Sequence, residues 1–482
     1  MNKRYWSALV IVLVVLDIAL TFWQNYQLPL DGDLVPTVFP APWYSQVLHD
    51  PFGWAVLTQN ATYAGTNRFF AHAAISLYWK QVPHLLQYLL VPIDSLYAAS
   101  ALFATVVQAG VLLGLAAYVR LGAGGRRGSW PYWLAVLLLA PLFQTDGFYE
   151  QMGITNHAIT YNFFYAFPVA LLLLLLWPFY RAAHQQRPLQ LPLWRAVALV
   201  LLMVVVAFNG PIATAAVAVL LVATAVYWAW QQWQARQRDA TPAPASWLSA
   251  QAMLLLGIWS ALSLYSLYIG RNNAENAHTH TLWELYQLLP TGIYRELTMQ
   301  RGLPLLIALI VINAQLIRHA TPASPERQRV LHKLRWVAFF TVVFLCLLPF
   351  GGYREYRPYL VRGDSVLPIL VGLFYAYGVS TCFLLANTSL SHRVRLAYVP
   401  LLVLFAGTLI FADTTLKMSF NNDCERWAFE QMAQSKEPIV RVAPDCNVLA
   451  WVTMGDYHQT ELQAEMLYFW GVTNRKRTYY QQ

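Results

Sequence analysis

The amino-acid sequence predicts an all-α polytopic membrane protein with about 11 transmembrane helices, and its composition is the first reason. Of 482 residues, 58% are hydrophobic and only 11% are charged, whereas soluble domains carry about 25% charged residues. The mean hydropathy is +0.41, and uncharged runs such as 170–177 recur along the chain. These features exclude a soluble domain, and the 15% of aromatic residues excludes a disordered chain.

The apolar segments have the length that a membrane requires, since a spanning helix needs about 20 mostly apolar residues. The third segment is short and is interrupted by Pro141, and the turn Asn209-Gly210-Pro211 separates the fifth from the sixth. The predicted spans are 6–24, 99–119, 130–145, 160–180, 193–209, 211–230, 247–269, 303–317, 336–350, 366–386 and 396–412.

Basic residues predict the orientation of these spans. Every second connection is short and basic, as with Arg126 and Arg127 after the second span and Arg393 and Arg395 after the tenth. Because Lys and Arg collect in cytoplasmic loops, we expect a cytoplasmic N-terminus and an extracytoplasmic (periplasmic) C-terminus. The net charge of +9 is then attributed to topology and to membrane lipids, with no nucleic-acid partner. The predicted location is the inner (cytoplasmic) membrane.

Two regions outside the spans stand out. Residues 1–412 form the predicted transmembrane domain, in which 25–98 is a large first outer loop, and residues 413–482 form a small extracytoplasmic C-terminal region. Within the loop, Ile75–Leu90 has apolar residues at helical spacing, which is typical of a helix lying in the membrane interface. Cys424 and Cys446 both fall in the C-terminal region, where an oxidising compartment would allow a disulfide; two free thiols are the alternative.

Acidic residues occupy the first two outer loops. Asp31 and Asp33 follow the first span, and Asp146, Glu150 and His157 lie in the second loop. A carboxylate near the membrane can act as a general base on a hydroxyl, or hold a divalent cation such as Mg²⁺ or Mn²⁺. The alternative for Asp31 and Asp33 is a turn or a helix cap, which Asp-Gly sequences favour.

The arrangement resembles the GT-C superfamily of membrane glycosyltransferases. The shared features are a cytoplasmic N-terminus, a long first outer loop that opens with acidic residues, a short acidic second loop, and later outer loops with Arg and His. The layout of 11 spans with an outer tail is also similar to that of protein O-mannosyltransferases. The chain departs from the family in having Asp31-Gly32-Asp33 instead of an Asp-Glu pair, and it carries no oligosaccharyltransferase signature.

The resemblance implies transfer of a sugar from a polyprenyl-phosphate-linked donor to a glycan, lipid or protein acceptor on the outer face. Asp31 or Asp33 would be the general base of an inverting displacement, while Asp146, Glu150 and His157 would contact the acceptor or a metal. No nucleotide is expected, because the sequence has no phosphate-binding Gly-rich loop. Guanidinium groups match phosphate oxygens in two-point contacts; the implied residues for the donor phosphate are Arg354, Arg357, Arg362, His278 and His280.

Several alternatives remain at this point. The three arginines could instead be headgroup anchors or form ion pairs with Glu355 and Asp364. An O-antigen-type polymerase or ligase also uses lipid-linked sugars, and it would depend on Arg354 and Arg362 more than on Asp31. A lipid or solute transporter would use Asp17 within the first span, but the sequence shows little of the half-sequence symmetry that such proteins usually have.

Overall fold

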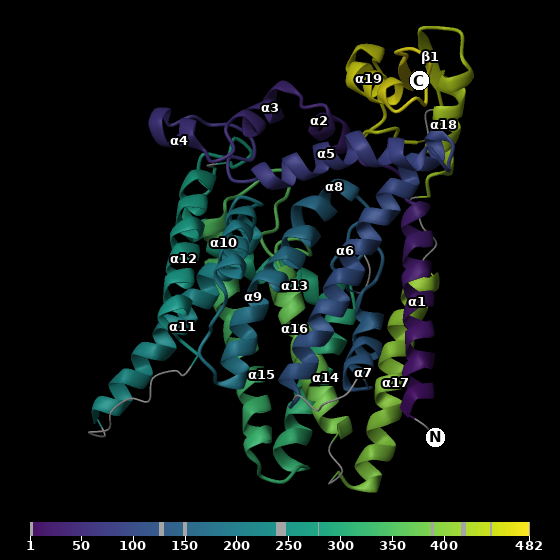
Figure 1. The fold of residues 1–482 in the computed structure, drawn as a ribbon. Coiled ribbons are helices and arrows are strands. Elements are labelled where there is room, and N and C mark those ends of the chain that lie inside the picture. Colours follow the sequence, from purple (N-terminus) through teal and green to yellow (C-terminus); the bar gives the residue numbers. More distant parts are fainter. Residues whose placement is uncertain are drawn as a thin grey trace.

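The computed structural model describes residues 3–481 except 125–129, 148–151, 238–246, 278, 387–389, 416–420 and 444–445. The described chain is almost entirely helical, with one two-stranded sheet among these residues. Figure 1 shows a bundle of long, roughly parallel helices, a layer of shorter helices across one end of it, and a small C-terminal lobe above that layer.

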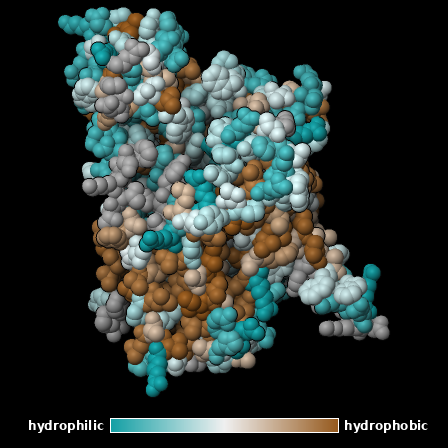
Figure 2. Space-filling model, turned by 180° about the vertical axis from the view of Figure 1, so that it is seen from behind, coloured by the Kyte–Doolittle hydropathy of each residue, from teal (hydrophilic) through white to brown (hydrophobic). Residues whose placement is uncertain are grey.

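The long helices of the bundle have the length and composition of membrane spans. Within the described ranges, nine helical segments are long and apolar enough to cross a membrane. On the face shown in Figure 2, hydrophobic residues form a broad band around the bundle, and the lobe above it is mostly hydrophilic. The nine segments comprise α1 (Lys3–Tyr26), α6 (Pro92–Gly122), α8 (Ile159–Tyr161) with η2 (Asn162–Ala166) and α9 (Phe167–Gln185), α11 (Pro211–Gln237), α12 (Ala250–Gly270), α14 (Gly302–His319), α15 (Pro325–Leu347) with η3 (Leu348–Gly351), α16 (Leu367–Ala386) and α17 (His392–Thr415).

Two shorter apolar helices occupy the positions of the third and fifth predicted spans. They are α7 (Trp130–Leu139), continued by η1 (Ala140–Leu142), and α10 (Leu193–Ala207). Pro141 lies in η1 and accounts for the interruption, because proline cannot donate the backbone hydrogen bond that continues a helix. The all-α polytopic membrane class is confirmed, whereas the number of 11 spans and their orientation remain predictions.

A layer of four helices from the first outer loop covers one end of the bundle. These are α2 (Leu34–Val38), α3 (Pro42–His49), α4 (Trp54–Gln59) and α5 (Phe69–Leu86). The carboxylate of Asp50 accepts hydrogen bonds from the backbone N–H groups of Trp54 (2.6 Å) and Ala55 (2.8 Å), which begins α4. Figure 1 shows α5 lying across the ends of the spanning helices, and this helix contains most of the predicted Ile75–Leu90 segment.

A further amphipathic helix, α13 (Leu282–Met299), lies between α12 and α14. Thr281 and Glu284 form a capping box at its start: the Thr281 hydroxyl accepts from the Glu284 N–H, and the Glu284 carboxylate accepts from the Thr281 N–H. This cap fixes the beginning of a helix whose C-terminal turns contribute to the cavity described below.

The C-terminal lobe packs on the helical layer and shares its core. The lobe consists of α18 (Asp423–Gln434), β1 (Ile439–Val442), η4 (Tyr457–Thr460), α19 (Glu461–Phe469) and β2 (Thr478–Gln481), and β1 and β2 form a parallel pair. Leu34 and Trp79 of the layer belong to the same buried cluster as Phe429 and Trp470 of the lobe. The Trp470 indole N–H donates to the Trp79 carbonyl at 3.0 Å. The lobe therefore shares one hydrophobic core with α2 and α5.

One disulfide and one buried carboxylate stabilise the lobe. Cys424 and Cys446 are joined by a disulfide. The buried carboxylate of Glu425 accepts hydrogen bonds from the N–H groups of Leu30 (2.9 Å) and Leu449 (3.0 Å) and from the Tyr97 hydroxyl (2.9 Å). Because these donors come from the loop after α1, the lobe itself and α6, Glu425 ties three parts of the chain together.

Candidate functional site

A polar cavity of about 1030 Å³ lies where the helical layer, the bundle and the lobe meet. Its lining brings together Asp33 from the first outer loop and the three predicted arginines Arg354, Arg357 and Arg362 from the loop before α16. Trp451 of the C-terminal lobe also lines it. With residues of 156–165 and 275–300, five separate segments of the chain thus converge on one space.

The two aspartates of the first loop have different positions. Asp31 is buried, and its carboxylate accepts hydrogen bonds from the backbone N–H groups of Asp33 (3.0 Å) and Thr160 (2.9 Å). Burial, with the nearby Asp33 charge, raises the pKa of Asp31 to about 6. Asp33 is the one that lines the cavity. Asp31 therefore positions the turn, and Asp33 is the carboxylate that a ligand in the cavity would meet.

The protein environment raises the pKa of Asp33 above the usual value of an aspartate in water. Burial raises the pKa of this carboxyl, while hydrogen bonds from the Trp451 and Tyr161 side chains and the positive charge of Arg357 act in the opposite direction. The result is a partly buried carboxylate with a pKa above its usual value, which is the property expected of a general base.

Gly32 explains why the lobe can reach this turn. A Cβ atom at position 32 would lie 2.5 Å from the backbone nitrogen of Trp451 and 2.8 Å from the carbonyl carbon of Ala450. These are backbone atoms that cannot move aside, so only glycine allows the two segments to touch. The Asp31-Gly32-Asp33 turn is thus the place where the lobe brings Trp451 close to Asp33.

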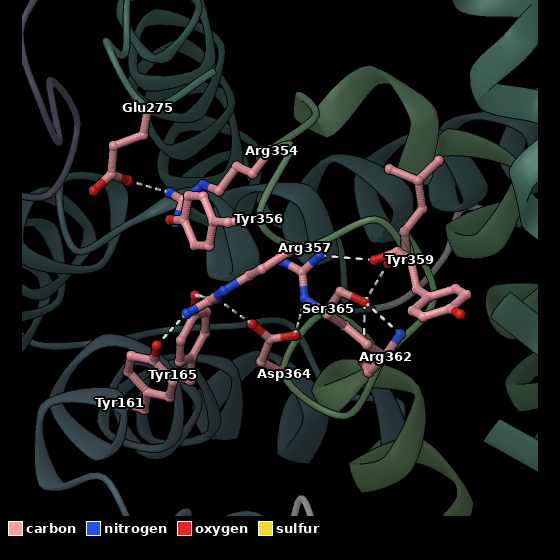
Figure 3. Close-up of polar contacts among 11 residues, drawn as sticks. Tyr161, Tyr165, Glu275, Arg354, Tyr356, Arg357, Tyr359, Arg362, Asp364 and Ser365 are labelled. Atoms are coloured by element: carbon pink, nitrogen blue, oxygen red, sulfur yellow. Dashed lines mark hydrogen bonds and ion pairs between the residues drawn. The ribbon is translucent and has the colours of Figure 1, made fainter. Parts of the chain in front are cut away.

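Each of the three predicted arginines pairs with a carboxylate, as Figure 3 shows. Arg354 Nη2 lies 2.5 Å from Glu275 Oε2, and the Tyr44 hydroxyl donates to Glu275 Oε1 at 3.1 Å. Burial alone would raise the pKa of Glu275, but the charges of Arg354 and Arg68 hold it below the usual value. This carboxylate is therefore ionised and fixed.

Arg357 and Arg362 share the carboxylate of Asp364. Arg357 Nη1 is 2.9 Å from Asp364 Oδ2, and Arg362 Nε is 2.6 Å from Asp364 Oδ1. Arg357 also donates to the Tyr165 hydroxyl at 3.1 Å and to the Tyr161 hydroxyl (Figure 3). Two guanidinium groups around one carboxylate leave a net positive charge beside Asp33 in the same cavity.

Two further arginines line the cavity and form no salt bridge among the described residues. Arg68 lies over the Phe164 ring with its guanidinium carbon 5.7 Å from the centroid, and Arg295 lies over Tyr359 at 4.4 Å. In the described lining, five arginines face four carboxylates. The cavity consequently suits a ligand that carries an anionic group, and Arg68 and Arg295 are the cations most available to it.

The remaining predicted residues lie elsewhere. Asp146 and His157 pair with each other: the His157 N–H donates to Asp146 Oδ1 at 2.8 Å, and His157 Nδ1 is 3.1 Å from Asp146 Oδ2. His280 is exposed, and its ring packs against that of Tyr353 with 4.4 Å between the two ring centroids. None of these three residues is in the described lining of the cavity. Glu150 and His278 lie outside the described residues.

A bound divalent cation is not favoured by the described lining. No group of three or more His, Cys, Asp or Glu side chains in the described part of the chain is placed to hold a metal ion. Glu275 and Asp364 are already neutralised by arginines. Metal dependence remains an untested expectation.

Sequence reasoning missed Arg68, Glu275 and Trp451. Arg68 and Glu275 lie in long outer connections with no local motif, and Trp451 lies in a tail whose position hydropathy cannot predict. The one available signal was Gly32 between two acids, since a glycine at such a place marks a close approach of backbone.

Comparisons with known proteins add no assignment. Neither a scan of protein-family models nor a search of curated proteins gave a match to this chain.

Proposed function

We propose that the protein is a membrane glycosyltransferase of GT-C type that transfers a sugar from a polyprenyl-phosphate-linked donor to an acceptor hydroxyl on the outer face of the membrane. The observation that carries the proposal is the single cavity that holds Asp33 together with five arginines. A base and a set of fixed cations in one space are what this transfer requires, because a proton must be accepted and a phosphate must depart.

The reaction is an inverting displacement. The acceptor oxygen attacks the anomeric carbon and gives its proton to the Asp33 carboxylate, while the bond from that carbon to the phosphate oxygen breaks. The lipid phosphate leaves with the electron pair, and guanidinium groups stabilise its charge. Arg68 and Arg295 are proposed as the phosphate contacts, whereas Arg354, Arg357 and Arg362 are held in place by their carboxylates.

The decisive experiment uses the purified full chain in lipid nanodiscs with a panel of polyprenyl-phosphate sugars, and it follows release of the lipid phosphate. Asp33→Asn should lower the rate by about 10²–10⁴-fold, the usual contribution of a positioned base. Asp423→Asn is the matched control, because Asp423 is exposed on the lobe and outside the described cavity lining. Full activity of Asp33→Asn would reject the proposal.

The same panel separates the rival functions. Loss of lipid-phosphate release in Arg354→Gln and Arg362→Gln, with Asp33→Asn unaffected, would favour an O-antigen-type polymerase or ligase. With the protein reconstituted into liposomes instead of nanodiscs, movement of the labelled lipid across the membrane without cleavage would favour a transporter.

A further inference from the structure

A second cavity, of about 720 Å³, lies inside the helical bundle. It is bordered by α6, α9, α11, α12, α15 and α16, and its lining is mainly apolar, with Leu172, Trp259 and Phe340 as typical members. In the described chain it shares no lining residue with the polar cavity. The two cavities are therefore separate sites.

One end of this apolar cavity carries a partly buried cation. Lys333 of α15 lines the cavity, and its Nζ donates to the carbonyl of Gly122, the last residue of α6, at 2.6 Å. Nζ also lies 3.4 Å from Nδ1 of His184, near the end of α9. Because an ammonium group can only donate, His184 accepts there and is neutral. Figure 1 places the C-terminal ends of α6 and α9 at the end of the bundle opposite α5.

Among the described residues, no carboxylate forms a salt bridge with Lys333. Arg329, another cation, is the charged group that acts on both Lys333 and His184. A carbonyl dipole and a neutral imidazole do not cancel a full charge. Leaving an ammonium group without a counter-ion beside apolar walls costs free energy.

We propose that this cavity binds an anionic phospholipid, with acyl chain against the apolar walls and phosphate at Lys333. The apolar lining matches a hydrocarbon chain, and the uncompensated ammonium matches a phosphate. A soluble phosphate fits only the Lys333 end, and an uncharged lipid would leave the ammonium unpaired. The site is independent of the proposed transferase activity, because it uses none of the residues of the polar cavity.

The test measures lipid binding to the purified full chain. Phosphatidylglycerol and diacylglycerol with the same acyl chains are titrated separately, and bound lipid is counted by native mass spectrometry. Lys333→Gln should weaken phosphatidylglycerol binding by at least about tenfold, in line with the loss of one charge-assisted contact, and should leave the binding of diacylglycerol, which has no phosphate, unchanged. The control Arg335→Gln removes an exposed charge on the same helix, outside the described lining, and should change neither.

A second variant probes the apolar walls without touching the charge. Gly372 lines the cavity, and a Cβ there would meet Val337 Cγ1 at 3.5 Å, an ordinary contact. Gly372→Ala should therefore bind phosphatidylglycerol normally, whereas Gly372→Leu should fill the space and reduce binding. The proposal would be overturned if Lys333→Gln and Arg335→Gln lost binding equally, or if the wild type bound both lipids equally. It would also be overturned if inorganic phosphate or polyprenyl phosphate displaced the bound lipid, or if Gly372→Leu bound phosphatidylglycerol as the wild type does.

Discussion

The pH dependence of stability should depend strongly on one buried carboxyl, that of Glu425. This side chain is 1% exposed and accepts three hydrogen bonds, of which those from the Leu30 N–H and the Tyr97 hydroxyl join the lobe to the rest of the protein. Burial nevertheless dominates and raises its pKa from 4.5 to about 7. The folded protein thus binds this proton more tightly than the unfolded chain does.

The sign and size follow from linkage. Because the folded-state pKa is raised, the contribution of Glu425 is fully present below about pH 4.5 and is lost as the pH rises to about 7. At about 1.4 kcal/mol per pKa unit, the loss amounts to about 3 kcal/mol. Glu425→Gln cannot ionise and so removes this loss. The amide NH₂ group of the new glutamine would face one of the backbone N–H donors. Because two donors cannot bond to each other, this substitution lowers the free energy of unfolding by about 1–3 kcal/mol at every pH.

The assay is thermal unfolding of the purified protein between pH 5 and 8, with Glu430→Gln as control, because Glu430 is exposed on the same helix. Glu425→Gln should be less stable than the wild type at pH 5, and this deficit should shrink or reverse by pH 8. Glu430→Gln should follow the wild type throughout. Parallel curves for the wild type and Glu425→Gln would refute the reasoning.

Three further predictions concern the lobe and the polar cavity. Gly32→Ala should destabilise the lobe by about 1–3 kcal/mol through overpacking against Trp451 and should lower transfer activity; a normal melting temperature would contradict the contact. Cys446→Ser should cost about 3 kcal/mol, because the disulfide spans 22 residues, and chemical reduction of the wild type should have the same effect. The acid limb of the pH–activity profile should lie above pH 3.8, because burial raises the pKa of Asp33. Arg357→Gln should move this limb to higher pH, because it removes a positive charge that lowers the pKa of Asp33. A limb that does not move would exclude Asp33 as the titrating base.

Hydropathy predicted the fold well because the membrane imposes a simple rule on segment length. The segments that deviated did so for local reasons: α7 ends at the proline-containing η1, and α10 has only 15 residues. Period and composition also indicated a helix around Ile75, now part of α5. The association of the lobe with the first loop was not predictable, since it depends on contacts between distant segments.

The candidate site was predictable in part. Asp33 and Arg357 could be predicted because charged residues are rare in this chain, and because Asp33 follows the first predicted span while Arg357 precedes the tenth. Which aspartate faces the cavity was not predictable, since it depends on the hydrogen bond from the Thr160 N–H to Asp31. The partners of the arginines were also hidden, because Glu275 comes from a different outer loop than Arg354.

The shared core of the first loop and the lobe has a consequence for biosynthesis. Leu34 and Trp79 are made early, but the side chains that bury them, Phe429 and Trp470, are made near the end of the chain. Contacts between such distant segments form slowly. A nascent chain that has already formed most of its helices therefore still lacks Trp451 beside Asp33, and its polar cavity stays incomplete until the last segment of the chain has been made.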